Sequence, residues 1–266
     1  MQVLKTLIND YKKRVVRSPL HKLTLDIKGR IELSKFSKIN NQITGNSTAY
    51  CISPYKTGTT YLAGCYAKGV SAHEPLDYLS LKQLDKNFDD LFIRRLNTLN
   101  LKLECSGFFS AYIDELAAHP IAKDFNFIVI LRSPSSWITS TVNFWAKIGN
   151  DKHHFHIDNE LFWKNKFGVD LNMLLRVSEK ERAQTLKKLV DFYMCVTQKT
   201  QKLHNVHYIK LEDIDSYLPV LDGLIGETSN PKSSQINANN SKVFRYENDE
   251  IDREYENLVI KLTRNA

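Results

Sequence analysis

Residues 53–62 read Ser53-Pro54-Tyr55-Lys56-Thr57-Gly58-Thr59-Thr60-Tyr61-Leu62, and this stretch decides the fold. The run before it, Thr48 to Ile52, is short and largely apolar, which predicts a buried parallel strand. The run after it, Tyr61 to Lys68, predicts a helix with Thr59 or Thr60 in its first turn. A strand, a tight loop and a helix start form a phosphate-binding geometry, because loop N–H groups and the helix N-terminus point at the anion.

The side chains of this loop favour anion binding over an ordinary strand-to-helix turn, which is the alternative. Lys56 adds a cation and three threonines add hydroxyl donors, more than a turn requires. The loop is not the nucleoside-triphosphate loop G-x-x-x-x-G-K-[ST]. In that motif the Lys follows the second Gly, whereas Lys56 comes two residues before Gly58.

Lys-Thr-Gly-Thr-Thr resembles the loop that binds the 5′-phosphosulfate of PAPS (3′-phosphoadenosine 5′-phosphosulfate) in sulfotransferases. The usual family form is P-K-S-G-T-T-W; this chain has Tyr55 between Pro and Lys, Thr57 for Ser and Tyr61 for Trp. The resemblance implies a P-loop-like α/β fold, a single domain with a central, mostly parallel sheet flanked by helices. It also implies roles in donor binding: Lys56 would stabilise the transferring group, Thr57, Gly58, Thr59 and Thr60 would hold the 5′-phosphate, and Tyr61 would lie at the adenine.

A second motif follows the most apolar run of the chain, Phe125 to Leu131, which predicts a central strand. Arg132-Ser133-Pro134 comes next, where a nucleoside triphosphatase would favour a Mg²⁺-binding Asp, and Ser140 stands eight residues after Arg132. This pattern resembles the sulfotransferase motif for the donor's 3′-phosphate, which a guanidinium and a helix hydroxyl can bind together. The alternative for Arg132 is a surface ion pair.

A candidate general base follows the predicted strand Gly69 to Ala72, in His73-Glu74-Pro75. Parallel strands deliver ligands at their carboxyl ends, so both side chains should lie near Lys56. The carbohydrate branch of the resembled family places a Glu here, often as Glu-Pro, whereas the small-phenol branch places a His where this chain has Cys105-Ser106. We therefore expect Glu74 to be the base, with His73 as runner-up, and a glycan or glycolipid as acceptor. The alternative for Glu74 is a carboxylate that stabilises a helix start.

The net charge of +7 lies in residues 1–42, which hold ten Lys/Arg and three Asp/Glu and form a basic segment before the predicted domain, residues 43–266. Residues 2–17 place apolar side chains at helical spacing with basic ones mostly opposite. Such a helix can lie on an anionic membrane, or can pack on the domain with its charges in water. Nucleic-acid binding is not expected, because no stacking aromatic residues are interleaved with the basic ones.

Composition bounds the remaining classes. No run is long and apolar enough to span a membrane, and the four cysteines have no C-x-x-C spacing, so we expect reduced core cysteines and a cytoplasmic enzyme, or one peripheral at the inner membrane surface. The cluster Lys152-His153-His154-Phe155-His156 lacks further ligands at metal-binding spacing, so no metal is expected. It is expected to be a solvated loop or a contact to the acceptor.

The rest of the chain supplies scaffold. Ser178 and Glu181 fit a helix-capping box. The loop 227–246 contains Ser241 and Lys242, near where the resembled family closes a basic loop over the 3′-phosphate. The other expected elements are helices at 79–99, 111–117, 214–225 and 247–264, a long helix after Ser178, strands at 101–105 and 206–210, and irregular chain at 147–168.

Two motifs and one candidate base favour a PAPS-dependent sulfotransferase, which moves a sulfuryl group to a hydroxyl or amine and releases PAP (adenosine 3′,5′-bisphosphate). The alternatives are a nucleotide-dependent kinase of the same architecture and a non-catalytic protein that binds nucleotide or a membrane surface. The kinase has the loop spacing and Arg132 against it.

Overall fold

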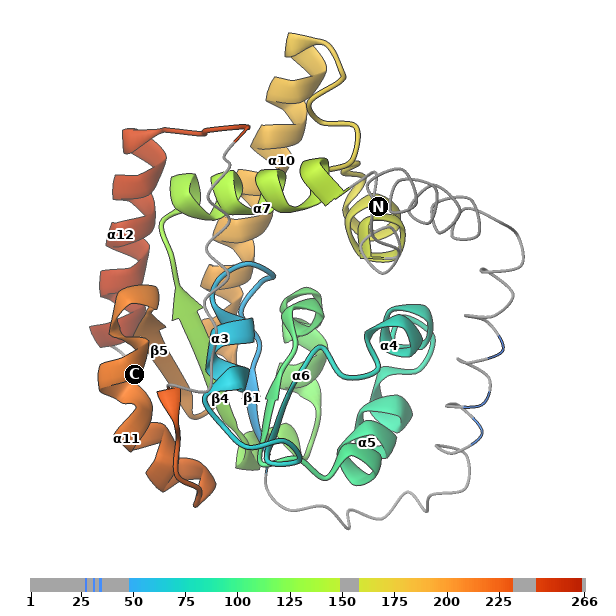
Figure 1. The fold of residues 1–266 in the computed structure, drawn as a ribbon, viewed down its shortest axis with the longest axis vertical. Coiled ribbons are helices and arrows are strands. Elements are labelled where there is room, and N and C mark those ends of the chain that lie inside the picture. Colours follow the sequence, from blue (N-terminus) through green and yellow to red (C-terminus); the bar gives the residue numbers. More distant parts are fainter. Residues whose placement is uncertain are drawn as a thin grey trace, which may run out of the picture.

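The structure is a computed structural model that describes residues 48–148, 158–231 and 243–264, with the single positions 27, 31 and 34 (Figure 1). One parallel sheet forms its centre, with strand order β2-β3-β1-β4-β5. The strands are β1 (Ala49–Cys51), β2 (Ser71–His73), β3 (Leu103–Cys105), β4 (Asn126–Leu131) and β5 (Val206–Lys210). Every pairing is parallel, and Cys51 of β1 stands opposite Cys105 and Ile128 of its two neighbours. The expected α/β class with a single sheet is confirmed.

Helices cover both faces of this sheet. Their bounds are α3 (Thr59–Gly64), α4 (Asp77–Gln83), α5 (Phe88–Leu99), η1 (Gly107–Ala111), α6 (Ile113–Ala118), η2 (Ala122–Asp124), α7 (Pro134–Ile148), η3 (Asn159–Lys164), α9 (Asn165–Phe167), α10 (Glu179–Lys199), η4 (Thr200–Lys202), η5 (Leu211–Asp213), α11 (Ile214–Ile225) and α12 (Asp249–Arg264). The strand expected at 206–210 is β5, and the helix expected at 214–225 is α11, so both are found at the expected residues.

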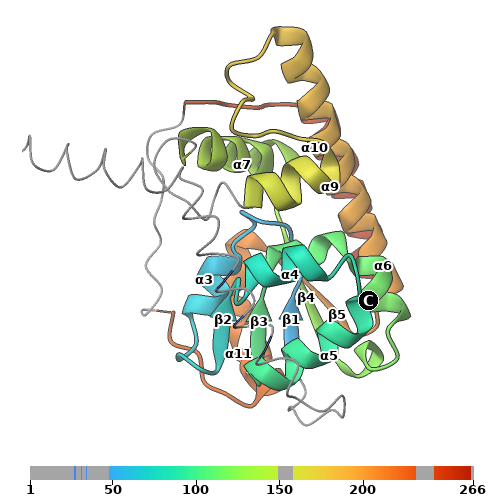
Figure 2. The same ribbon diagram turned by 90° about the vertical axis from the view of Figure 1, so that its right-hand side faces the viewer.

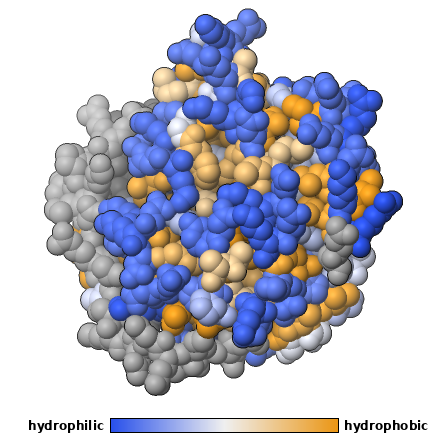
Figure 3. Space-filling model, turned by 180° about the vertical axis from the view of Figure 1, so that it is seen from behind, coloured by the Kyte–Doolittle hydropathy of each residue, from blue (hydrophilic) through white to orange (hydrophobic). Residues whose placement is uncertain are grey.

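The strands are buried on both faces, as a parallel sheet between helices requires. Along β4, Phe127, Val129 and Leu131 pack into the larger core with α5, α6, α7, α10 and α12. Ile128 and Ile130 alternate with them and pack into a smaller core with α3 and α11. Seen from behind, the surface is mostly hydrophilic and broken by small hydrophobic areas (Figure 3). The run Phe125 to Leu131 is apolar because alternate residues of β4 pack into the two cores on opposite faces of the sheet.

Several boundaries differ from the expectation. The helix expected at 79–99 is two helices, because the Asn87 side chain accepts from the backbone N–H of Asp90 and starts α5 anew. Residues 158–167 are helical rather than irregular, with a π-helical turn at η3. The capping box at Ser178 is confirmed. Cys51, Cys65 and Cys105 are buried, but Cys195 is exposed, so its expected place in the core is wrong.

The path of the chain places the site. After β1 the chain passes to β2 and β3 on one side of the sheet, and after β4 it passes to β5 on the other. The carboxyl ends of β1 and β4 therefore meet at a topological switch point, the usual ligand position in such sheets. In Figure 1 the β4 arrow points toward α7, and Figure 2 shows α7 and α9 lying over that end of the sheet. Within the described part of the chain, no helix combines the length and apolarity needed to cross a bilayer.

One glycine fixes how closely η1 approaches the loop after β1. A Cβ on Gly107 would lie 2.7 Å from the backbone N of Tyr55, and backbone cannot move aside as a side-chain tip can. We expect Gly107→Ala to lower the free energy of unfolding by about 1–3 kcal/mol, the usual cost of overpacking. Urea denaturation checks this. The matched control is Gly223→Ala on α11, where the added Cβ meets nothing within 4 Å. It should stabilise by about 0.5–1 kcal/mol. Equal effects in the two variants would contradict the packing.

Candidate functional site

The loop between β1 and α3 is held in one shape by its own residues. Gly58 has φ +122°, a conformation that favours glycine. The Thr57 hydroxyl is buried and donates to the carbonyl of Pro54 at 2.8 Å, so it braces the loop from inside. Trp137 Nε1 donates to the carbonyl of Tyr55 at 2.8 Å and fixes the loop to α7. Thr57 thus shapes the loop in this structure and does not point a free hydroxyl at a ligand.

Lys56 is the first of two cations at this end of the sheet. Its backbone has φ +69°, and its Nζ lies 3.9 Å from the centroid of the Phe144 ring, within cation–π range. Burial and, to a smaller extent, the nearby Arg132 charge lower the pKa of Lys56 to about 8. Among the described residues, no carboxylate is within ion-pair distance of this ammonium group.

Arg132, after β4, is the second cation. Its Nη1 donates to the backbone carbonyl of Lys56 at 2.7 Å, and its Nε donates to Ser136 Oγ at 2.9 Å. The expected alternative, a surface ion pair, is not found: no carboxylate of the described residues pairs with Arg132. A guanidinium has five N–H donors, so Arg132 keeps donors for a ligand. Two positive side chains thus lie together with no counterion from the part of the chain that the structure describes, which is the electrostatic setting of an anion site.

The hydroxyl that Arg132 contacts was not the one expected from the sequence. Ser140 lies on α7, but no hydrogen bond joins it to Arg132, whereas Ser136 accepts from the Arg132 side chain. Ser136 stands four residues after Arg132 and four before Ser140. Residues four apart share one helix face, so this spacing could have identified Ser136 from the sequence. Ser136 and Ser140 therefore belong to the same face of α7.

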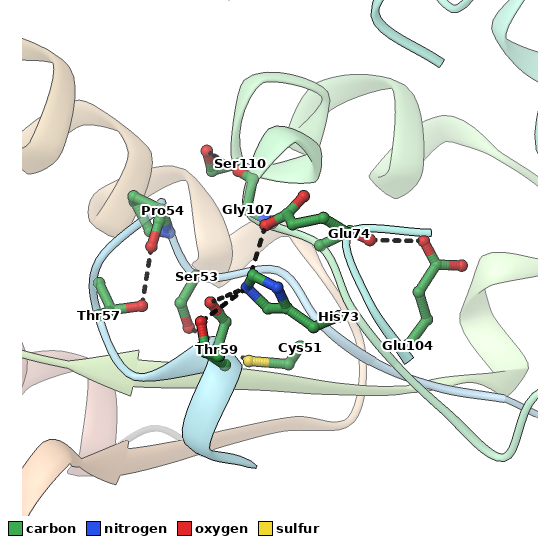
Figure 4. Close-up of polar contacts among 12 residues, drawn as sticks. Cys51, Ser53, Pro54, Thr57, Thr59, His73, Glu74, Glu104, Gly107 and Ser110 are labelled. Atoms are coloured by element: carbon green, nitrogen blue, oxygen red, sulfur yellow. Dashed lines mark hydrogen bonds and ion pairs between the residues drawn. The ribbon is translucent and has the colours of Figure 1, made fainter. Parts of the chain in front are cut away.

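His73 lies against the phosphate loop from the end of β2. Its Nε2 is 3.0 Å from Thr60 Oγ1, 3.3 Å from Thr59 Oγ1 and 3.7 Å from Glu74 Oε1 (Figure 4). Although 34% of the His73 side chain is exposed, burial of the ring lowers its pKa to about 4, and Lys56 contributes to this shift. At neutral pH the ring is therefore uncharged. The hydroxyls of Thr59 and Thr60 are directed at His73 in this structure.

Glu74 directly follows β2 and lies next to His73. Its Oε1 accepts from the backbone N–H of Gly107 at 2.8 Å, at the first residue of η1 (Figure 4). Its Oε2 is buried and has no hydrogen-bond partner. Burial raises the pKa of Glu74 well above its usual value, and the negative charges of Asp158 and Asp77 raise it further. A half-satisfied carboxylate with a raised pKa is suited to take up a proton.

A buried ion pair, absent from the sequence analysis, supports the Glu74 segment. Arg95 of α5 pairs with Glu104 of β3 and donates to the carbonyl of Pro75 at 3.0 Å. Ser106 Oγ donates to the same Glu104 oxygen at 2.7 Å. The pair therefore holds both the residue after Glu74 and the residue before Gly107. Two opposite charges inside apolar segments, Arg95 and Glu104, were the signal that the sequence offered.

The remaining candidates are placed as follows. The Tyr61 hydroxyl donates to Asp215 Oδ1 at 2.5 Å, which ties α3 to α11. Ser241 and Lys242, the amphipathic segment 2–17 and the cluster 152–156 lie outside the described residues. No group of three or more metal-binding side chains occurs in the part of the chain that the structure describes. The structure thus brings together Lys56, Thr59, Thr60, His73, Glu74 and Arg132.

Comparisons with known proteins give one similarity. No model of a known protein family matches the chain, and no curated protein matches it. Among solved structures, the chain is similar to a crystal structure of a sulfotransferase from Alicyclobacillus acidocaldarius. The TM-score is 0.45 at 12% sequence identity, and the match covers 82% of this chain and 95% of that one. A similarity of this size does not assign the chain to a family.

The lowered pKa of Lys56 makes a testable statement about anion binding. An anion binds the protonated ammonium, and the free protein loses that proton above pH about 8. The dissociation constant of PAP, measured by calorimetry from pH 7.5 to 9.5, should therefore rise by up to tenfold per pH unit above pH 8. In Lys56→Arg the dependence should be nearly flat, because a guanidinium stays charged. The same steep rise in that variant would assign the titration to another group.

Proposed function

We propose that the protein transfers the sulfuryl group of PAPS to an acceptor hydroxyl or amine. One observation carries the proposal: Lys56 and Arg132 lie together at the carboxyl ends of β1 and β4 with no counterion among the described residues. The two motifs that supply these residues are those that resemble the donor-binding motifs of sulfotransferases. A bis-phosphorylated nucleoside supplies negative charge at two points, which suits two separate cations.

The proposed reaction is an in-line displacement at sulfur. The acceptor oxygen forms a bond to sulfur while the bond from sulfur to the 5′-phosphate oxygen breaks, and PAP leaves with that electron pair. Glu74 takes the acceptor's proton, as its raised pKa permits. Lys56 stabilises the negative charge that develops on the leaving phosphate and the sulfuryl oxygens. His73, which is neutral and hydrogen-bonded to the loop, positions Thr59 and Thr60 in this scheme.

The donor's other end is assigned to α7. Arg132, with Ser136 and Ser140 on one helix face, binds the 3′-phosphate in this proposal. The same proposal assigns Tyr61 to the adenine and, from the sequence alone, Ser241 and Lys242 to the 3′-phosphate. The chemistry needs no metal, because fixed cations do the charge stabilisation. The acceptor class, a glycan or glycolipid, is proposed from the Glu74-Pro75 sequence alone.

Labelled PAPS, incubated with a panel of glycans, lipids and phenols, tests the proposal. We expect transfer to a glycan or glycolipid, a loss of about 100-fold or more in Glu74→Gln, and an affinity for PAP that stays within about threefold in that variant. Binding of ATP–Mg²⁺ but not PAP would favour the kinase alternative instead. An unchanged rate in Glu74→Gln would remove Glu74 as the base.

We also propose that residues 1–17 hold a cytoplasmic enzyme at an anionic membrane surface, because their charged and apolar residues are arranged as on an interfacial helix. The full-length chain should co-sediment with vesicles that contain anionic lipid, and less so as salt is raised. Reversing the charge at Lys12, Lys13 and Arg14 should abolish this binding. Binding that is insensitive to salt and to these changes would contradict the electrostatic account.

A further inference from the structure

A second polar cluster lies on the other side of the phosphate loop, around the hydroxyl of Tyr55. This side chain is 5% exposed, and no described residue forms a hydrogen bond with its Oη. Tyr55 is the residue by which the loop departs from P-K-S-G-T-T-W. A buried hydroxyl usually finds a partner, so an unpartnered one in a functional loop requires an explanation.

Carboxyl groups act electrostatically on this hydroxyl. The charges of Glu74, Asp158 and Asp77 all act on Tyr55 and raise the pKa of its hydroxyl well above the usual value, after burial itself. Two of these carboxyl groups also have an unpartnered oxygen: Glu74 Oε2 and Asp158 Oδ1. Asp158 is 7% exposed and precedes η3, which packs on α4 beside α9 (Figure 2). Three segments of the chain, those after β1, after β2 and before η3, therefore each bring one buried polar atom without a hydrogen-bond partner among the described residues to this region.

Contacts confirm that the cluster adjoins the site described above. Gly107 contacts the Tyr55 backbone and donates to Glu74, which fixes the Glu74 carboxylate beside the loop. The Tyr55 ring packs on Phe162 and Trp145, with centroids 5.0 and 5.6 Å away. Trp145 follows Phe144, whose ring lies under Lys56. The Glu74 side chain is 12% exposed to solvent, so the cluster reaches the surface at this residue.

The cluster is unfavourable without a cation. Burial, the charge of Asp77 and a hydrogen bond to the Asp77 side chain raise the pKa of Asp158 well above its usual value. Among the described residues, no Lys or Arg pairs with Asp158 or Glu74. A hydroxyl on a ligand could donate a hydrogen bond to the unpartnered oxygens of Glu74 and Asp158 but could not compensate the charges of these two carboxylates, whereas an ammonium group would do both. Aromatic faces beside the carboxylates add cation–π attraction.

We propose that Tyr55 and Asp158 form an anchoring site for a protonated amine on the acceptor, next to the group that Glu74 deprotonates. The site would select acceptors that carry a free amino group, such as amino sugars, over their N-acetylated forms. This inference rests on the proposed function only for the role of the ligand as acceptor. Binding itself needs neither donor nor turnover.

The test is calorimetry of the full chain, without donor, with two probes: a glucosamine trisaccharide and the N-acetylglucosamine trisaccharide. We expect the amine form to bind at least tenfold more tightly. Because the carboxyl groups of Asp158 and Glu74 hold protons more strongly when no cation is near, amine binding at pH 7 should release protons, seen as a heat that depends on the buffer. Equal affinity for the two trisaccharides would overturn the inference.

Variants assign the effect. Asp158→Asn should weaken amine binding at least tenfold and abolish most proton release, and Tyr55→Phe, which removes only the hydroxyl, should weaken it severalfold. Both should bind PAP as the wild type does, which shows that they are folded. Asp114→Asn, at an exposed ion pair with Lys199, is the matched control and should change nothing. An amine preference that survives in both Asp158→Asn and Tyr55→Phe would also overturn the inference.

Failure of this site and failure of the proposed function have different signatures. If PAP binds and sulfuryl transfer occurs but the two trisaccharides bind equally, only the amine anchor is wrong. If the amine form binds preferentially through Asp158 but PAP does not bind, the anchor is right and the donor assignment is wrong.

Discussion

The structure depends on keeping two like charges close together. Lys56 and Arg132 follow neighbouring strands, and the Arg132 guanidinium donates a hydrogen bond to the Lys56 carbonyl, so the charge of Arg132 acts on the Lys56 ammonium group. Two positive groups in a partly buried place are unfavourable without an anion, and the described residues supply no carboxylate to pair with them. The protein offsets this cost with a rigid loop: Thr57 bonds inside it, Gly58 turns it, and Trp137 fixes it to α7. Such an arrangement is stable mainly when an anion completes it.

Negative groups, instead of positive ones, surround Tyr55, the residue before Lys56. Tyr55 faces carboxyl groups that raise one another's pKa, while Lys56 faces a cation that lowers its own. The loop therefore separates a region that needs an anion from a region that needs a cation or protons. Glu74 lies between them, bonded through Gly107 to the segment that contacts the Tyr55 backbone. In the proposed reaction this places the donor's negative groups and the acceptor's positive group on either side of the proton acceptor. The buried Arg95–Glu104 pair fixes the backbone next to Glu74 and Gly107 through hydrogen bonds with Pro75 and Ser106. Breaking such a buried pair typically costs about 3–5 kcal/mol of folding stability.

The strands could be predicted well from the sequence. Strands that are buried on both faces have mostly apolar sequences, and Gly, Pro or polar residues mark their ends. It also predicted that His73 and Glu74 would lie near Lys56, because all three lie at or just after the carboxyl ends of parallel strands, which share one edge of the sheet. Contacts made by individual side chains could not be predicted in the same way. The Thr57 hydroxyl points into the loop, and the Thr59 and Thr60 hydroxyls contact His73. The Arg132 side chain contacts Ser136 and not Ser140. These side-chain conformations depend on packing against segments that are distant in the sequence. The break at Asn87, the π-helical turn η3 and the exposed Cys195 are likewise tertiary effects.

The most direct test of the two-cation account compares PAP with adenosine 5′-monophosphate, which lacks the 3′-phosphate, by calorimetry on Lys56→Met and Arg132→Met. If each cation holds its own end of the nucleotide, Lys56→Met weakens both ligands by about tenfold or more, whereas Arg132→Met weakens PAP strongly and the monophosphate little. Equal losses for both ligands in both variants would mean that Lys56 and Arg132 hold a single anion together, which would contradict the account.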